Sequence, residues 1–337
     1  MTALRAGVIG LGMMGRNHAR VLQELDGVDL VAVADPFGDR HGAARDVPCV
    51  DDLDALLEHR LDLCVVAVPT ADHEAVGLQL AGAGVHTLIE KPLAEEIVGA
   101  RRLVDAFKTA GLVGCVGHIE RYNPALQSLR ARLEAGELGA IFQIATRRQG
   151  PFPNRIRDVG VVKDLATHDV DLTAWVAGQR FTSVSARTAF KTGRQHEDLV
   201  AATGMLTDGT ITNHLVNWLT PMKERVTVAT GERGCFVADT LTADLTFYAN
   251  GDTPTSWDAI SRFRGVSEGD MVRFAIPKPE PLKVELAAFR DAVLGEPGAT
   301  VEMRDGLAAV LVAEACLESA RKGVTVDVDV DAASLGA

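Results

Sequence analysis

The sequence lacks any apolar run that approaches the length of a membrane-spanning helix, and it has no internal repeat or low-complexity tail. Its five cysteines are far apart and form no C-x-x-C pair, which argues against a disulfide framework or a zinc ribbon and favours a reducing cytoplasm. The first residues lead directly into a strand-like run, so we expect no signal peptide.

The chain has fewer basic than acidic residues. It contains 34 lysines and arginines against 46 aspartates and glutamates, which gives a net charge of −12. That balance argues against a general nucleic-acid or anionic-membrane binder, although it allows a local basic pocket for a phosphorylated substrate. The length of 337 residues and the hydrophobic content of 47% predict two domains with substantial cores.

The first third of the chain alternates short apolar runs with helix-compatible stretches, which predicts parallel strands joined by crossover helices. The strand-like runs cover residues 6–9, 30–34, 63–68, 87–89 and 113–116, and the clearest helices cover 13–24, 71–83 and 95–110. We therefore predict an α/β domain with a doubly wound parallel sheet at residues 1–120.

The pattern changes in the remainder of the chain, residues 121–337. Helix signals cover residues 124–135, 162–176, 283–294 and 303–321. Strand-like runs between residues 181 and 247 are separated by tight turns, which predicts a mostly antiparallel sheet, and residues 250–281 read as a long loop. This second α/β domain has a two-sided sheet that invites self-association, so we expect a homo-oligomer, either a dimer or a tetramer.

The most informative segment runs from Val8 to Asp35 and contains a G-x-G-x-x-G turn between an apolar run and a helix-compatible stretch. Gly10 permits a tight turn, Gly12 lets the backbone approach a pyrophosphate, and Gly15 lets the helix lie close to the sheet. The helix N-terminus offers free N–H groups to the phosphates. Asp35 ends the next apolar run and can accept hydrogen bonds from both ribose hydroxyls. This order predicts a dinucleotide site.

Polar residues, proline or glycine follow several other predicted strands. Open α/β sheets bind their ligands at these carboxyl ends of the strands. The residues are Pro69-Thr70, Glu90-Lys91-Pro92 and Gly117-His118. A lysine at such a strand end, beside a nicotinamide, could bind a substrate oxygen and lower the pKa of that hydroxyl. A plain surface lysine is the alternative for Lys91, and the sequence leaves the Lys91–Pro92 bond open between cis and trans.

The segment K-D-L-A-T-H-D-V-D-L begins at Lys163. As a helix it places Asp164, His168 and Asp171 on one face, beside an apolar stripe that would pack on the sheet. Histidine suits proton transfer near neutral pH, and a neighbouring carboxylate can orient it. A solvated polar face is the alternative. A metal site is disfavoured because neither a second histidine nor a soft ligand accompanies these residues.

Three further segments carry charged or aromatic side chains. Residues 117–124 end the first domain and contain Arg121, Tyr122 and Asn123, at a junction of the kind where ligand sites often form. Residues 147–157 hold four arginines, whose forked guanidinium groups suit phosphates. An ordinary interdomain connection and a solvated basic loop are the alternatives. His196-Glu197-Asp198 reads as a turn before a strand.

Together these motifs resemble the Gfo/Idh/MocA oxidoreductases over nearly the whole chain. The matching pieces are G-L-G-M-M-G, V-A-V-A-D, P-T-A-D-H, E-K-P and D-L-A-T-H-D-V-D, in this order. The resemblance implies an N-terminal Rossmann domain, a larger open-sheet α/β domain, and hydride transfer between a nicotinamide and a sugar or cyclitol carbon. One departure is the family's glycine pair before the catalytic helix, which is only partly kept, at Gly160.

The resemblance and the motifs together predict roles for individual residues. The expected catalytic residues are Lys91, Asp164 and His168. The cofactor is expected to lie against Gly10, Gly12, Met13, Met14, Gly15, Asp35, Pro69, Thr70, His73, Glu90, Lys91 and His118. The substrate is expected to contact Lys91, Arg121, Tyr122, Asn123, Arg155, Arg157, Lys163 and His168. No metal is expected.

A narrower similarity points to the branch of the family that oxidises the 3-hydroxyl of UDP-N-acetylglucosamine. It is carried by G-H-I-E-R-Y-N-P-A, R-Q-G-P-F-P-N-R-I-R-D-V-G-V and N-W-L-T-P-M-K-E-R. Dehydrogenases of inositols or free sugars and ketosugar reductases are alternatives, and so is a regulator that binds NAD without chemistry. The expected partner is a sugar or a nucleotide sugar rather than nucleic acid or a membrane.

The first prediction concerns the choice of cofactor. A carboxylate at Asp35 repels a 2′-phosphate, so NAD should bind at least several-fold more tightly than NADP, with Arg40 remaining a surface side chain. Asp35→Ala should narrow this difference because it removes both the repulsion and the ribose hydrogen bonds. Fluorescence titration with each cofactor measures the ratio, and a wild-type preference for NADP would contradict the prediction.

Overall fold

The computed structural model describes residues 3–153, 159–251, 267–296 and 298–329, which fall into two compact units. The first unit contains the described residues up to Ile119 together with Pro279–Leu311. The second contains Glu120–Lys278 and the described residues from Val312 onward. Among the described residues, no helix combines the length and the apolar character needed to cross a membrane.

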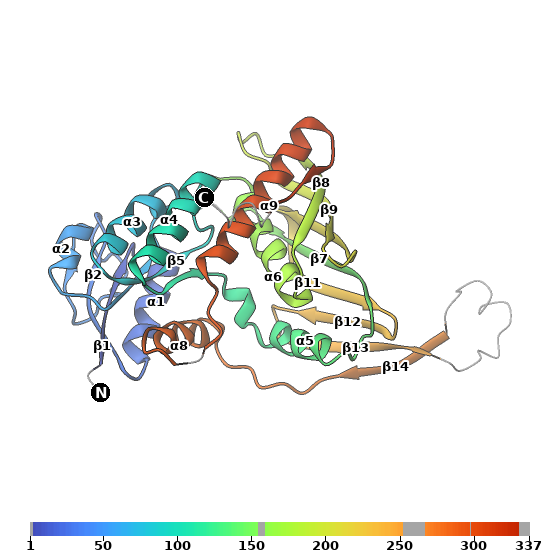
Figure 1. Cartoon of the computed structure of the whole chain (residues 1–337), viewed down its shortest axis with the longest axis horizontal. Coiled ribbons are helices and arrows are strands. Elements are labelled where there is room, and N and C mark those ends of the chain that lie inside the picture. The colour runs from blue at the N-terminus through green and yellow to red at the C-terminus, as the bar shows by residue number, and fades with distance from the viewer. Residues whose placement is uncertain (1–2, 154–158, 252–266, 297, 330–337) are drawn as a thin grey trace. The chain divides into compact units, whose positions relative to one another are not determined.

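Unit 1 is built on a six-stranded parallel sheet in the order β3-β2-β1-β4-β5-β6 (Figure 1). Its strands are β1 (Leu4–Ile9), β2 (Val28–Ala34), β3 (Cys49–Val50), β4 (Leu63–Val66), β5 (His86–Glu90) and β6 (Gly114–Gly117). Its connecting helices are α1 (Met13–Glu24), α2 (Leu53–Leu57), η1 (Thr70–Asp72), α3 (His73–Gly82) and α4 (Ile97–Ala110). This is the strand order of a Rossmann fold, and it confirms the predicted doubly wound sheet.

The sequence predicts that residues 121–337 form the second domain, but Pro279–Leu311 belongs to unit 1. Helix α8 (Pro281–Val293) instead buries Leu282, Leu286 and Phe289 in the core formed by α1 and the parallel sheet. The start of α9 (Met303–Lys322) also belongs to this unit, where Met303 lies beneath Gly114 of β6. Apolar periodicity shows that a helix buries one face, but it does not say which sheet receives that face.

Unit 2 contains a nine-stranded sheet in the order β14-β13-β12-β11-β7-β10-β9-β8-β15. Its strands are β7 (Ile141–Pro151), β8 (Phe181–Ala189), β9 (Leu199–Leu206), β10 (Ile211–Asn217), β11 (Leu219–Gly231), β12 (Gly234–Asp239), β13 (Asp244–Gly251), β14 (Ser267–Arg273) and β15 (Val326–Asp327). The β7–β10 pair is parallel and the other pairs are antiparallel, as predicted for most of this sheet. The long loop predicted at residues 250–281 is wrong at β14, which pairs with β13.

The two faces of this sheet differ. Helices α5 (Pro124–Glu134) and α6 (Thr167–Ala177) pack on one face, where Ile144, Phe236 and Leu245 are fully buried. The strand register turns the alternate residues to the opposite face. That face exposes large apolar side chains on four strands, namely Met205, Ile211, Tyr248 and Met271.

The buried face of unit 2 also holds a histidine, which yields the second prediction. His214 lies in the sheet with its Nδ1 atom 2.9 Å from Thr146 Oγ1, and burial lowers its pKa to about 4. An unfolded histidine takes up its proton near pH 6.5, whereas the folded protein keeps His214 neutral down to about pH 4. His214 should therefore lower the free energy of unfolding by about 3 kcal/mol as the pH falls from 6.5 to 4. His214→Leu should flatten that slope in denaturant titrations, whereas the exposed His41→Leu should not. Equal slopes in all three proteins would contradict the prediction.

Candidate active site

The glycine turn of unit 1 has the geometry that a dinucleotide requires. Gly10 has a φ of +87°, and a Cβ atom there would lie 2.6 Å from the Ala67 carbonyl oxygen. A Cβ atom on Gly15 would lie 1.7 Å from the Gly10 carbonyl oxygen, so α1 can approach β1 only with glycine at this position. Gly12, the N-cap of α1, differs because its Cβ would meet no heavy atom within 4 Å. The open space lies at the end of the helix where phosphate oxygens bind.

Asp35 is held against this turn. One carboxylate oxygen accepts a hydrogen bond from the Leu11 N–H at 2.7 Å, and the other accepts one from the Phe37 N–H at 2.9 Å. Each oxygen has a second lone pair that a ribose hydroxyl can use. Arg40 is exposed and lies over the Phe37 ring, 4.8 Å from its centroid. The turn, the carboxylate and the open helix end therefore fit a dinucleotide.

The E-K-P turn that follows β5 is held by the buried side chain of Glu90. Glu90 is buried, with one carboxylate oxygen 2.8 Å from His18 Nε2 and the other accepting the Lys91 backbone N–H at 3.2 Å. Burial would raise the pKa of Glu90, but the hydrogen bond from His18 and the charge of Lys91 outweigh it, so the pKa lies below its usual value. The Lys91–Pro92 bond, left open by the sequence, is cis.

The other residues expected to line the cofactor lie at the same edge of the sheet, because they follow parallel strands. Pro69 and Thr70 follow β4, and the buried His118 follows β6. His73 has its ring nitrogens 2.8 Å from the Pro92 carbonyl oxygen and 3.1 Å from that of Val68, and burial lowers its pKa. His73 thus ties together the two segments that follow β4 and β5.

In unit 2, the predicted catalytic helix begins with an irregular turn. Val162–Ala166 forms a π-helical turn, η3, that continues into α6. Such turns often mark functional sites, and they shift the phase of Asp164 relative to the α-helical residues that follow. Asp164 is buried on η3, and His168 is partly buried in the first turn of α6. An α-helical wheel drawn from the sequence cannot include this shift.

Glu197 holds the start of this turn. Its carboxylate accepts the Val162 N–H at 3.0 Å, and a Cβ atom on Gly160 would lie 2.0 Å from the same oxygen. The glycine kept from the family pattern is therefore required by this close contact. His196-Glu197-Asp198 does precede β9 as predicted. This role of Glu197 is not predictable from local sequence, because the bond joins residues 35 positions apart.

Several residues predicted to bind substrate already form ion pairs or hydrogen bonds. Arg121 donates two hydrogen bonds to Asp171, at 2.9 and 2.6 Å, and Lys163 lies 2.7 Å from Glu314. The Asn123 side chain caps α5 by accepting the Ala125 N–H, and it donates to the Thr240 carbonyl oxygen. Tyr122 is buried.

The basic segment of residues 147–157 is divided. Arg148, on β7, is buried and donates to Asp169 and Glu120, each at 2.8 Å, so its charge is neutralised within unit 2. Arg147 is exposed and pairs with Glu224 at 2.8 Å. Arg155 and Arg157 lie outside the described residues.

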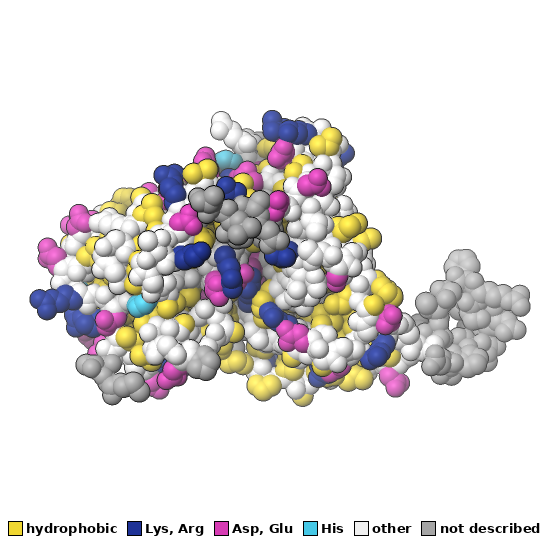
Figure 2. Space-filling model, in the orientation of Figure 1, with side chains coloured by type: hydrophobic (Ala, Val, Ile, Leu, Met, Phe, Trp, Pro, Cys, Tyr) yellow, Lys and Arg dark blue, Asp and Glu magenta, His cyan; other side chains and the backbone are white. Residues whose placement is uncertain are grey.

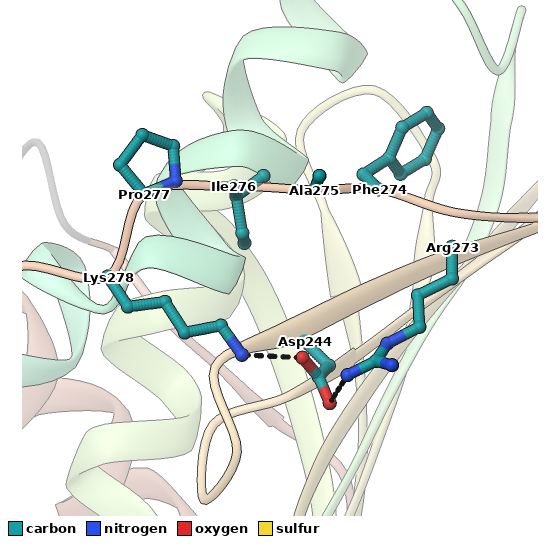
Figure 3. A pocket seen from close by; sticks show the side chains of 7 residues that line it. All are labelled: Asp244, Arg273, Phe274, Ala275, Ile276, Pro277 and Lys278. Carbon is teal, nitrogen blue, oxygen red and sulfur yellow. Dashed lines mark hydrogen bonds and ion pairs between the residues drawn. The ribbon is translucent and has the colours of Figure 1, made fainter.

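A surface pocket in unit 2 is separate from these residues (Figure 3). There Asp244 accepts hydrogen bonds from Lys278 at 2.6 Å and from Arg273 at 2.8 Å, and these bonds hold its pKa well below the usual value. No predicted catalytic residue is among its seven lining residues.

Basic and acidic side chains are interspersed on the face seen in Figure 2. Within the described ranges, no group of three or more His, Cys, Asp or Glu side chains could hold a metal ion.

Two family models match the chain. Residues 4–118 match the oxidoreductase family NAD-binding Rossmann fold of GFO_IDH_MocA, and residues 126–237 match the GFO/IDH/MocA C-terminal domain. The Rossmann domain in unit 1 is thus an NAD-binding domain, in agreement with the glycine turn and Asp35.

Individual relatives agree with these models. UDP-N-acetylglucosamine 3-dehydrogenase from Acidithiobacillus ferrooxidans is 35% identical over 63% of this chain and 66% of its own length. Inositol 2-dehydrogenase 4 from Saccharopolyspora erythraea is 34% identical over 55% of this chain and 57% of its own, so both alignments span less than two thirds of the relative. The solved structure of the Acidithiobacillus enzyme, GnnA, superposes with a TM-score of 0.83 at 27% identity, covering 96% of this chain and 99% of that one.

The third prediction uses the contrast between two glycines. Gly12→Ala adds a methyl group in open space, so thermal unfolding of the cofactor-free protein should be nearly unchanged while the Kd for NAD rises. Gly10→Ala is the matched control, because its methyl group would clash with the backbone at a residue of positive φ. This variant should therefore unfold at a lower temperature than the wild-type protein. Calorimetric titration and thermal denaturation separate the two effects. A Gly12→Ala protein with wild-type NAD affinity would contradict the assignment.

Proposed function

The chain belongs to the Gfo/Idh/MocA oxidoreductase family, and from this premise we propose that it oxidises a sugar hydroxyl with NAD. The proposed substrate is a UDP-linked N-acetylhexosamine, such as UDP-N-acetylglucosamine, and the proposed carbon is C3. The observation that carries this choice is the 35% identity to UDP-N-acetylglucosamine 3-dehydrogenase. The GnnA structure, similar over almost the whole of both chains, supports it.

The dinucleotide would be held by unit 1. Gly10, Gly12 and Gly15 shape the turn for the pyrophosphate, and Asp35 accepts the adenosine ribose hydroxyls. Met13 and Met14 open the helix behind this turn. When bound, NAD supplies the acceptor for the hydride that leaves the substrate carbon.

The proposed chemistry divides between three side chains. His168 removes the proton of the substrate hydroxyl, because a neutral imidazole is available for this step near pH 7. Lys91 donates a hydrogen bond to the same oxygen and stabilises the negative charge that develops on it. Asp164 orients the reacting pair. These assignments are proposals that rest on the family motifs, on the fixed E-K-P turn and on the position of Asp164 and His168 on η3 and α6.

The residues proposed to recognise the rest of the substrate are Arg121, Tyr122, Asn123, Arg155, Arg157 and Lys163. Arg121 and Lys163 already pair with Asp171 and Glu314, so their contribution would be a hydrogen bond from a neutralised group rather than an uncompensated charge. We propose that Arg155 and Arg157 bind the diphosphate of a nucleotide sugar, because forked guanidinium groups suit phosphate oxygens.

A second candidate substrate is an inositol, because inositol 2-dehydrogenase 4 is 34% identical. A regulator that binds NAD without chemistry is the candidate from another class. Such a regulator would not need Lys91, Asp164 and His168 together. Turnover by the wild-type protein in an activity assay would decide against it. We also propose that the protein is a homo-oligomer in the cytoplasm, either a dimer or a tetramer. In this assembly a second copy covers the apolar sheet face that carries Met205, Ile211, Tyr248 and Met271.

The fourth prediction tests the general base. With UDP-N-acetylglucosamine, the oxidation rate should rise with pH through one ionisation, because His168 must be neutral to act. His168→Ala should remove that ionisation and lower kcat roughly 10²- to 10⁴-fold, with the Kd for NAD nearly unchanged. The exposed His41→Ala is the control and should keep the wild-type profile.

Two outcomes would redirect the proposal. If His168→Ala keeps kcat near wild type, another group is the base, and Tyr122 acting with Lys91 is the next candidate. If the wild-type protein reduces NAD with an inositol and not with UDP-N-acetylglucosamine, the inositol assignment replaces the nucleotide sugar.

A further inference from the structure

Three ionisable side chains lie buried behind the E-K-P turn of unit 1. Glu90 ends β5 and is 7% exposed, His18 comes from α1 and is fully buried, and Glu285 comes from α8 and is 1% exposed. We call Glu90 and Glu285 the buried carboxyl pair. Ionisable groups are rarely this buried without partners, so each needs a physical explanation.

The two carboxyl groups differ in their hydrogen bonds. Glu90 uses both oxygens, one toward His18 Nε2 at 2.8 Å and one toward the Lys91 N–H at 3.2 Å. Glu285 has no hydrogen-bond partner for either oxygen among the described residues. A carboxylate in such a position would be uncompensated, whereas a neutral carboxylic acid is much easier to bury.

The ionisation of the pair follows from this difference. Burial and the negative charge of Glu90 raise the pKa of Glu285 well above its usual value, whereas His18 and Lys91 bring that of Glu90 below its usual value. A buried carboxyl group whose oxygens accept hydrogen bonds ionises more easily than one whose oxygens accept none. The negative charge therefore belongs on Glu90.

We propose that His18 is a positioning residue for Lys91, because its hydrogen bond keeps the single negative charge of the buried carboxyl pair on Glu90 while Glu285 keeps the proton. The ionised Glu90 then holds the Lys91 backbone N–H and with it the direction of the lysine side chain. This inference rests on the proposed catalytic role of Lys91. It adds a role for His18 and Glu285, neither of which touches the substrate in the proposed mechanism.

The charged and titratable groups that face Glu90 come from four elements. They are His18 on α1, His73 on α3, Lys91 in the turn itself and Glu285 on α8. His73 is bonded to the Pro92 and Val68 carbonyl oxygens and holds the same turn from another side. His18 donates a side-chain hydrogen bond to Glu90 at 2.8 Å.

The kinetic test compares two substitutions of one residue. His18→Leu removes the donor and should lower kcat roughly 10- to 100-fold, with the Kd for NAD changed less than threefold, because a misdirected lysine impairs the reaction more than binding. His18→Gln keeps an N–H donor of similar reach and should recover most of the loss. In His18→Leu a second ionisation should appear in the pH–rate profile, on the acid side of the one assigned to His168, since Glu90 then takes up a proton more readily.

The matched control is His86→Gln. His86 lies at the opposite end of β5, where its Nδ1 accepts the Val113 N–H, so kcat should stay at the wild-type level. Equal kcat and equal pH profiles in wild type, His18→Leu and His18→Gln would overturn the positioning role. Loss of kcat in His18→Gln as large as in His18→Leu would also contradict it.

A spectroscopic test needs no activity. Infrared spectra of the wild-type protein at neutral pH should contain the carbonyl band of a protonated, buried carboxyl group, and Glu285→Gln should remove it. Absence of that band, or its persistence in Glu285→Gln, would contradict the proposal that Glu285 is protonated while Glu90 is ionised. Full activity of Lys91→Ala would instead refute the proposed function, so the two failures can be told apart.

Discussion

The close approach of α1 to the parallel sheet is the constraint on which the site in unit 1 depends. It is possible only because Gly15 has no side chain beside the Gly10 carbonyl oxygen. This packing places the open N-terminus of α1 at Gly12, the position that is proposed to receive the pyrophosphate. It also carries His18, one helical turn beyond Gly15, into the interior beside Glu90. The same contact therefore shapes the cofactor turn and supports the E-K-P turn.

Unit 2 uses its charges mainly to hold its own framework. Arg148 on β7 is neutralised by Glu120 and by Asp169 on α6, and Arg121 is neutralised by Asp171 on the same helix. Removing one partner from such a pair leaves a buried charge uncompensated, so these contacts should be costly to break. The irregular turn η3, anchored by Glu197, then fixes where Asp164 and His168 can lie.

The sequence predicted most of unit 1 because its signals are local. The apolar runs, the glycine spacing and the terminal Asp35 each specify structure within a few residues, and the predicted helix at 13–24 has the observed bounds. The interactions that sequence reading missed join distant positions, as His18 and Glu90 do across 72 residues and Val162 and Glu197 across 35. Helix α8 departs from its predicted domain for the same reason, because the core that receives it is built from the start of the chain. Strand β14 pairs with the preceding strand β13, and the loop prediction fails there because Ser267–Arg273 is mostly polar and lacks an apolar alternation.

The central claim is that this chain transfers the hydrogen on C3 of a UDP-linked N-acetylhexosamine to NAD. The most direct measurement uses UDP-N-acetylglucosamine deuterated at C3 and determines the mass of the reduced cofactor. We predict that the reduced cofactor carries deuterium and that its formation is slower than with the unlabelled sugar. Reduced cofactor without deuterium, or none at all when an inositol is readily oxidised, would contradict the claim.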